Sequence, residues 1–140
     1  MTAAASQRTT PPDLLGTWTL TRTIEDRASG ERLHVTGSTE LSRREDGRVA
    51  WTETGTMVRG DGSRIPVSRE LLVEERVEGW MVLFADGREF HSWAPGTQVV
   101  HPCGSDVYDG RIDVPGDGSW HVTWHVRGPR KDLSIRSTLS

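Results

Sequence analysis

The feature that most constrains this chain is the alternation of apolar and polar residues in short segments separated by glycine-containing turns. From Asp13 onward the turns recur too often to leave room for helices of ordinary length. Within a segment, residues such as Trp18 and Leu20 lie on one face and Thr17 and Thr19 on the other. This period of two is typical of half-buried strands. Only residues 12–15, just before the first glycine, permit a short helical turn.

The alternating segments predict an antiparallel all-β domain of about nine or ten strands. We expect the strands at 17–24, 33–41, 49–57, 65–76, 79–84, 88–94, 97–101, 107–114, 119–127 and 133–139. Short sequential turns and many strand edges favour an up-and-down closed barrel of about 8 to 10 strands, lipocalin-like, with a two-sheet sandwich as the alternative. The 140 residues allow one domain. We therefore expect a flexible N-terminal tail over 1–12 and a single barrel over 13–140.

Charge and cysteine content exclude several classes of protein. Seventeen basic and twenty acidic side chains give a formal charge of −3, and no basic cluster is long enough for nucleic-acid binding. The single Cys103 excludes an internal disulfide framework. The start of the chain lacks the apolar core of a signal peptide, and no segment is apolar enough to span a membrane. We expect a cytoplasmic protein, a monomer or homodimer, with no nucleic-acid or membrane partner.

Several strings in the sequence resemble known proteins. The string LLGTW (14–18) contains the Gly-X-Trp pattern of the first strand of lipocalins, fatty-acid-binding proteins and nitrobindins. Together with FADGREFH (84–91), HPCGSDVYDG (101–110) and WHVRGPRKD (124–132), it resembles an uncharacterised domain-of-unknown-function family of small bacterial proteins. The resemblance implies a lipocalin-like (calycin-type) barrel and no particular reaction. It also implies that Trp18 closes one end of the barrel beneath Arg136.

The six tryptophans leave two alternatives open. They either fill the barrel core or line a cavity for a small, partly apolar metabolite, since an indole supplies a rigid apolar wall and one N–H donor. Basic side chains near a barrel mouth would attract an anionic ligand. The residues that we expect to bind the ligand are Trp51, Trp80, Trp93, Trp124, Arg88 and Lys131.

Titratable side chains are concentrated between residues 88 and 131. His91 or His101 is a candidate general base, with Asp106 to orient it and Tyr108 as a donor to an oxyanion. These groups suit a cofactor-independent isomerase, cyclase or hydrolase. A polar plug, hydrogen-bonded within itself, is the structural alternative. A metal site including Cys103 lacks any recognisable ligand spacing, so we expect no metal and no cofactor.

A heme protein is a further alternative, because nitrobindins hold heme in a similar small barrel through one histidine. His121 or His125 would then be the axial ligand. The glycine-rich continuation that follows the tryptophan in nitrobindins is missing after Trp18. The sequence thus predicts binding of a small molecule, and leaves open whether the protein is an enzyme or a non-catalytic carrier.

Overall fold

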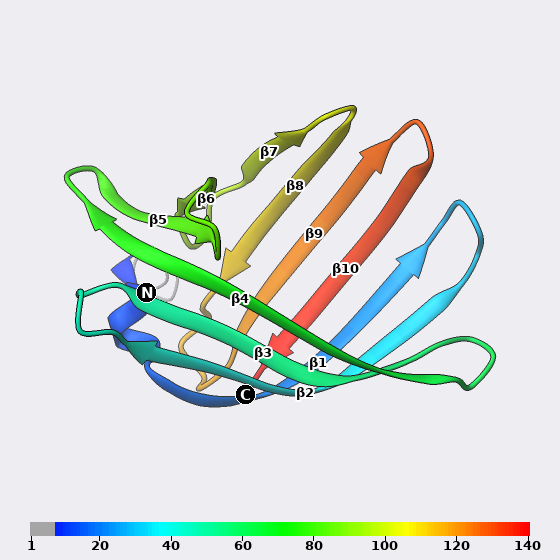
Figure 1. Cartoon of the computed structure of the whole chain (residues 1–140), viewed down its shortest axis with the longest axis horizontal. Helices are drawn as coiled ribbons and strands as arrows, with labels where there is room; N and C mark the ends of the chain where they lie inside the picture. Colours follow the sequence, from blue (N-terminus) through cyan, green and yellow to red (C-terminus); the bar gives the residue numbers. More distant parts are fainter. Residues whose placement is uncertain (1–7) are drawn as a thin grey trace.

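The computed structural model describes residues 8–140, which form one 3₁₀ turn and ten antiparallel strands (Figure 1). The elements are η1 (Pro11–Leu14), β1 (Gly16–Asp26), β2 (Arg32–Arg43), β3 (Val49–Val58), β4 (Arg64–Arg76), β5 (Gly79–Phe84), β6 (Glu89–Trp93), β7 (Val99–Cys103), β8 (Asp106–Asp113), β9 (Trp120–Gly128) and β10 (Lys131–Leu139). The predicted strands and the short helical turn are confirmed. The expected tail falls mostly on residues 1–7, which lie outside the described residues.

The strands form one curled sheet in the order β6-β5-β4-β3-β2-β1-β10-β9-β8-β7. Except for β6 and β7, each strand pairs with the next strand in sequence, and β1 also pairs with β10, from Leu20 opposite Leu139 to Asp26 opposite Leu133. This arrangement confirms the predicted up-and-down barrel. The closure is incomplete, because no backbone ladder joins β6 to β7. We call the interval between these two strands the seam.

The residues around the seam explain why the barrel stops short of full closure. Strands β6 and β7 have five residues each. Pro102 in β7 has no amide hydrogen to donate to a further strand. The connecting turn is held instead by β8, because the Gly96 amide donates to the Ile112 carbonyl at 2.8 Å. β7 therefore pairs with β8 and forms no ladder with β6.

A pair of glycines lets the sheet curl tightly between β2 and β3. Gly37 and Gly55 are directly opposite each other, on the face that points into the barrel. A Cβ added to Gly37 would lie 2.0 Å from the Thr54 carbonyl oxygen and 2.5 Å from the Gly55 Cα. Only residues without side chains permit this approach, which bends the sheet around its interior.

Four tryptophans close one end of the barrel, and we call them the tryptophan base: Trp18, Trp51, Trp93 and Trp120. Their ring centroids are separated by 5.4 to 6.1 Å between contacting pairs. The base is held by the N-terminal segment: the Trp18 indole donates to the Leu14 carbonyl and the Trp93 indole to the Thr9 carbonyl, both at 2.9 Å. The expected closure by Trp18 is confirmed. The expected contact with Arg136 is wrong, because Arg136 is exposed on the opposite face of the sheet and pairs in register with Thr23.

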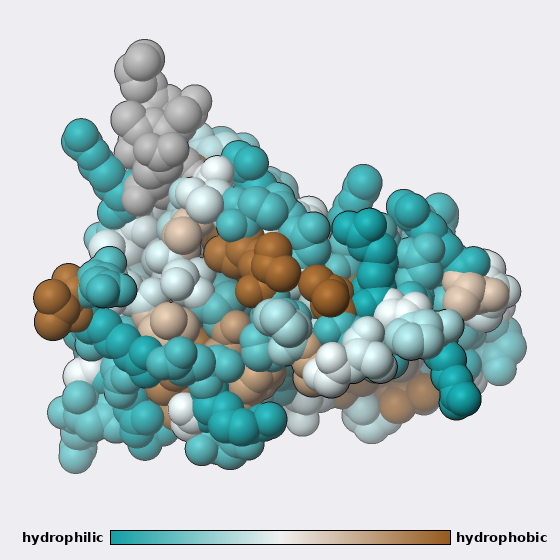
Figure 2. Space-filling view, turned by 90° about the horizontal axis from the view of Figure 1, so that it is seen from above, coloured by the Kyte–Doolittle hydropathy of each residue, from teal (hydrophilic) through white to brown (hydrophobic). Residues whose placement is uncertain are grey.

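The outer surface is mainly polar, and the view from above shows a small hydrophobic group among hydrophilic side chains (Figure 2). Val100 and Val107, on the outer face of the β7–β8 hairpin, are among the exposed large apolar residues. In the part of the chain that the structure describes, no helix is long and apolar enough to cross a membrane.

Candidate functional site

Three charged side chains occupy inward-facing positions in the middle of the barrel. Arg22 on β1 follows the same alternation as the buried Leu20, and Glu53 on β3 follows that of Trp51. Arg69 on β4 has the parity of the buried Leu71. Charged groups rarely occupy the interior unless they are paired. We call Arg22, Glu53 and Arg69 the interior charge cluster.

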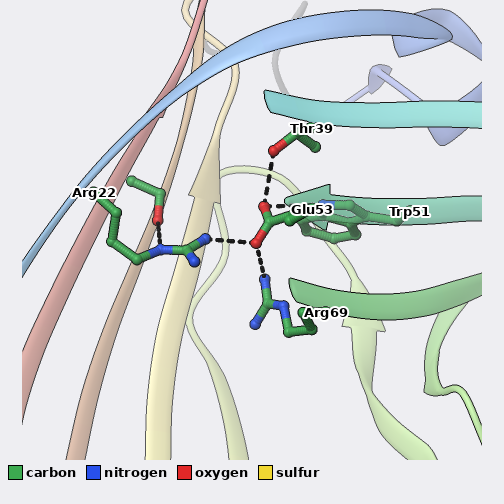
Figure 3. A network of polar contacts seen from close by, with 6 residues as sticks. Arg22, Thr39, Trp51, Glu53 and Arg69 are labelled. Carbon is green, nitrogen blue, oxygen red and sulfur yellow. Dashed lines mark hydrogen bonds and ion pairs between the residues drawn. The ribbon is translucent and has the colours of Figure 1, made fainter. Parts of the chain in front are cut away.

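Glu53 is the centre of the interior charge cluster (Figure 3). Its Oε1 accepts from Arg22 Nη2 at 2.8 Å and from Arg69 Nη2 at 3.1 Å. Its Oε2 accepts from the Thr39 hydroxyl at 3.0 Å and from the Trp51 indole at 3.4 Å. Arg22 is fixed further, because its Nε donates to Ser137 Oγ at 2.6 Å. The cluster therefore links strands β1, β2, β3, β4 and β10.

The electrostatics of the interior charge cluster are unbalanced. Burial alone would raise the pKa of Glu53, but Arg69, Arg22 and the hydrogen bonds together lower it below its usual value, so the carboxylate is ionised. Burial lowers the pKa of Arg69, and Glu53 only partly offsets this effect. Two guanidiniums face one carboxylate. The buried Nε of Arg69 also has no hydrogen-bond partner among the described residues.

A cavity of about 150 Å³ lies beside the cluster. Its lining comprises Arg22, Ile24, Arg69, Phe90, Tyr108, Val122, Trp124, Ile135 and Ser137. A second space of about 70 Å³ lies against the same two arginines on the side of β3. Ile24, Tyr108 and Ile135 are only partly buried, so they form the rim of the larger cavity. The cavity thus has a polar side built from arginine and serine and an apolar side that is largely aromatic.

The aromatic side of the cavity depends on an irregularity in β6. The register between β5 and β6 shifts after Val82, so that His91 is opposite Val82 while Glu89 is opposite Leu83. This bulge turns the consecutive residues Phe90 and His91 both toward the interior, where each is buried. Phe90 then stacks between Phe84 and Trp124, at centroid distances of 4.5 and 5.1 Å. We call Phe84, Phe90 and Trp124 the ring stack.

His91 is a buried neutral imidazole next to the cavity. Its side chain contacts Phe90 and Trp124, and its Nδ1 lies 2.9 Å from the Ser92 carbonyl oxygen. A carbonyl only accepts, so Nδ1 carries the proton and Nε2 keeps its lone pair. Burial, above all, lowers the pKa of His91 to about 4, and the positive charge of Arg69 contributes in the same direction. His91 is therefore uncharged at neutral pH.

The other predicted catalytic residues are only partly brought together. His101 on β7 and Tyr108 on β8 are paired in register, and both contact the Phe90 ring. Asp106 lies at the far end of β8, where it forms an ion pair with Lys131 at 3.1 Å. In the described part of the chain Asp106 contacts no histidine, so its expected role of orienting one stays a prediction. Cys103 is a free, exposed thiol on the same hairpin.

The predicted ligand-binding residues do not form one site. Trp124 lines the cavity. Trp51 and Trp93 are packed within the tryptophan base, with 2% and 7% of their surface exposed, and Trp80 lines a groove at the turn between β4 and β5. Arg88 is on the turn before β6, paired with Asp86, while Lys131 is paired with Asp106. The tryptophans thus divide among the core, the cavity and the groove, and neither predicted basic residue lines the cavity.

The histidines considered for heme lie on the outer face of β9. His121 lies 3.3 Å from the Thr138 hydroxyl, and His125 lies 2.8 Å from Asp132. Both alternate with the buried Val122 and Trp124, so neither points at the cavity. Within residues 8–140, no group of three or more His, Cys, Asp and Glu side chains is placed to hold a metal ion.

Sequence reasoning missed the interior charge cluster, although the sequence carries a signal for it. Arg22, Glu53 and Arg69 each occupy a position on the otherwise apolar face of an alternating segment. One such residue is compatible with a strand end at the surface. Three at the middle of long strands, with opposite charges among them, indicate a polar group inside the barrel.

One solved structure has an overall fold similar to that of this chain. The chain is similar in structure to the S-type phycobiliprotein lyase CPES from Guillardia theta, with a TM-score of 0.69 and 11% identity over 99% of this chain and 96% of that chain. A redesigned β-barrel, mFAP0, bound to DFHBI matches with a TM-score of 0.49 and 19% identity over 91% of this chain and 97% of that one. No curated protein sequence matches the chain. Residues 14–140, nearly all of the described part, match a family of unknown function, and the chain therefore belongs to this family, DUF6314.

Proposed function

We propose that the protein binds a small, partly apolar organic molecule in the cavity beside the interior charge cluster. The observation that carries this proposal is the two-sided lining of the cavity. Phe90, Tyr108 and Trp124 supply apolar area, and Arg22, Arg69 and Ser137 supply polar groups at fixed positions. Small-molecule sites in proteins combine an apolar wall with a few convergent polar groups in this way.

The size of the cavity limits the part of the ligand that it encloses. A cavity of roughly 150 Å³ holds one benzene ring, and this cavity, which is open on one side, has a volume of about 150 Å³. The half-buried rim residues Ile24 and Ile135 leave a path toward solvent. The proposal is therefore a ligand whose enclosed part is one ring with a polar substituent.

Binding without turnover accounts for the geometry better than acid–base catalysis. Asp106 is engaged by Lys131 and does not line the cavity. His91, with its pKa lowered to about 4, is a weak base at neutral pH. Tyr108, the predicted oxyanion donor, lines the cavity. Among the described residues, however, no carboxylate contacts His91 or His101 to orient it as a base. A ligand carrier or sensor needs none of these groups to titrate.

Thermal unfolding with a panel of one-ring aromatic compounds tests this function. A compound present at a hundred times its dissociation constant raises the midpoint by roughly 5 to 10 °C, since it stabilises the folded state by about 2.7 kcal/mol. Ile135→Trp fills the cavity from its rim and abolishes the increase. Val100→Trp adds the same side chain on the outer face and preserves the increase. A panel without any stabilising compound, or an unchanged response in Ile135→Trp, contradicts the proposal.

A further inference from the structure

We propose that the ligand of this cavity is an organic anion, an aromatic monocarboxylate whose carboxylate pairs with Arg69 and Arg22 while its ring lies against Phe90 and Trp124. This inference rests on the proposed binding function and specifies its chemical class. Four observations carry it: the excess charge of the cluster, the single hydrogen bond from Arg69 to Glu53, the position of Arg69 at the cavity, and the stacked rings opposite it.

The excess charge is the first observation. Arg22 and Arg69 bring two positive charges to the interior, and Glu53 brings one negative charge. If the interior charge cluster only held the strands together, one arginine would be enough and the cluster would be neutral. Glu53 already accepts hydrogen bonds from Arg22 and Thr39. Arg69 is only partly hydrated, so its positive charge is stabilised further when an anion accompanies it. One monovalent anion restores neutrality.

The second and third observations concern the guanidinium of Arg69. Only its Nη2 donates to Glu53. Its Nε also has no partner among the described residues, but it is fully buried, so a ligand in the cavity meets the terminal nitrogens of the guanidinium. The Arg69 side chain keeps 38% of its surface exposed while Glu53 keeps 5%, so Arg69 borders the open space and Glu53 lies behind it. Figure 3 shows Arg69 meeting Glu53 through one end of its fork. A planar carboxylate is the group that such a fork binds best.

The fourth observation selects an aromatic carboxylate over other anions. Phe90 and Trp124 stack at an interplanar angle of 11°, and both line the cavity opposite the arginines. A ligand ring gains contact with these rings while its carboxylate reaches the cluster. A phosphate ester would bring up to two negative charges against one unbalanced positive charge, with larger desolvation. Inorganic anions would leave the aromatic side uncovered.

Titration calorimetry with benzoate and benzamide separates this inference from the proposed function. The two probes have the same ring and differ in charge. We expect the wild-type protein to bind benzoate roughly tenfold or more tightly than benzamide. Arg69→Gln should abolish the preference for benzoate, because benzoate loses an ionic partner whereas benzamide loses only a neutral hydrogen bond. Glu53 retains Arg22 and Thr39 in this variant, so the fold keeps its central contacts.

Arg111→Gln is the matched control, because Arg111 is an exposed arginine on β8 that is likewise paired with one carboxylate, Asp113 at 2.7 Å. It should preserve the preference for benzoate. Equal affinity for both probes overturns the anion inference and leaves the binding function standing. Binding of neither probe overturns the anion inference, and the thermal-unfolding panel then decides the binding function. A preference that persists in Arg69→Gln overturns the assignment to Arg69. If Arg69→Gln fails to fold, the ratio of benzoate affinity to benzamide affinity in the wild-type protein decides the anion inference. Higher ionic strength must then weaken the binding of benzoate and leave that of benzamide unchanged.

Discussion

At the scale of single residues, His91 links the stability of the barrel to pH. Its pKa is lowered to about 4 in the folded protein, chiefly by burial, whereas an unperturbed histidine titrates near 6.5. Between these two values the unfolded chain takes up a proton that the folded chain does not. Stability is therefore complete above about pH 6.5, falls as the pH drops toward about 4, and then levels off, for a total of about 3 kcal/mol.

Urea unfolding at a series of pH values measures this contribution as a difference between variants. His91→Gln keeps a donor for the Ser92 carbonyl but does not titrate, so its stability should depend less on pH between about 4 and 6.5. His34→Gln, which removes an exposed imidazole, should retain the wild-type pH dependence. Identical slopes for wild type and His91→Gln would show that His91 accepts a proton without cost in the folded state.

At the scale of secondary-structure elements, the close approach of β8 and β9 fixes one wall of the cavity. Gly110 is paired with Trp124, and a Cβ at Gly110 would lie 2.3 Å from the indole ring. Gly110→Ala must push the indole toward Phe90 and the cavity. We expect a loss of about 1 to 3 kcal/mol of unfolding free energy, as is usual for an overpacked core, together with weaker ligand binding.

Chemical denaturation of a double-mutant cycle assigns the cost of Gly110→Ala to the indole. In a Trp124→Phe background, where the side chain is smaller, the alanine should cost at least about 1 kcal/mol less. Gly60→Ala is the control, since its Cβ would meet only the Glu31 side chain at 3.7 Å and should change stability by less than about 0.5 kcal/mol. An undiminished cost in the Trp124→Phe background would place the strain in the backbone instead.

At the scale of the whole molecule, the sequence was sufficient for the fold but not for the site. Alternation and turn glycines define each strand locally, so strand ends such as Val49 and Phe84 agree with the structure. Arg69 is the register partner of Glu53 on the adjacent strand β4, whereas Arg22 on β1 reaches Glu53 only because the sheet curls. The bulge that turns both Phe90 and His91 inward breaks the alternation, and a period of two cannot predict that break.

The seam between β6 and β7 is a weak side of the barrel, because side-chain contacts rather than a backbone ladder hold it together. The ring stack reaches from β5 and β6 to β9, and His101 on β7 contacts Phe84 and Phe90 edge-on. Edge strands that lack a second ladder open at lower free energy than strands paired on both sides, such as β1. Backbone amides in β6 and β7 should therefore exchange with solvent faster than those in β1.

Phe90→Leu tests whether the ring stack closes this weak side. Leucine cannot stack between Phe84 and Trp124, so exchange in β6 and β7 should accelerate by tenfold or more, which corresponds to about 1.4 kcal/mol of local opening free energy. Exchange in β1 and β10 should change only as far as global stability does. Val77→Ala, at an exposed turn, is the control. Uniform acceleration over all strands would mean that the seam opens only when the whole barrel unfolds, and that the stack stabilises the barrel as a unit.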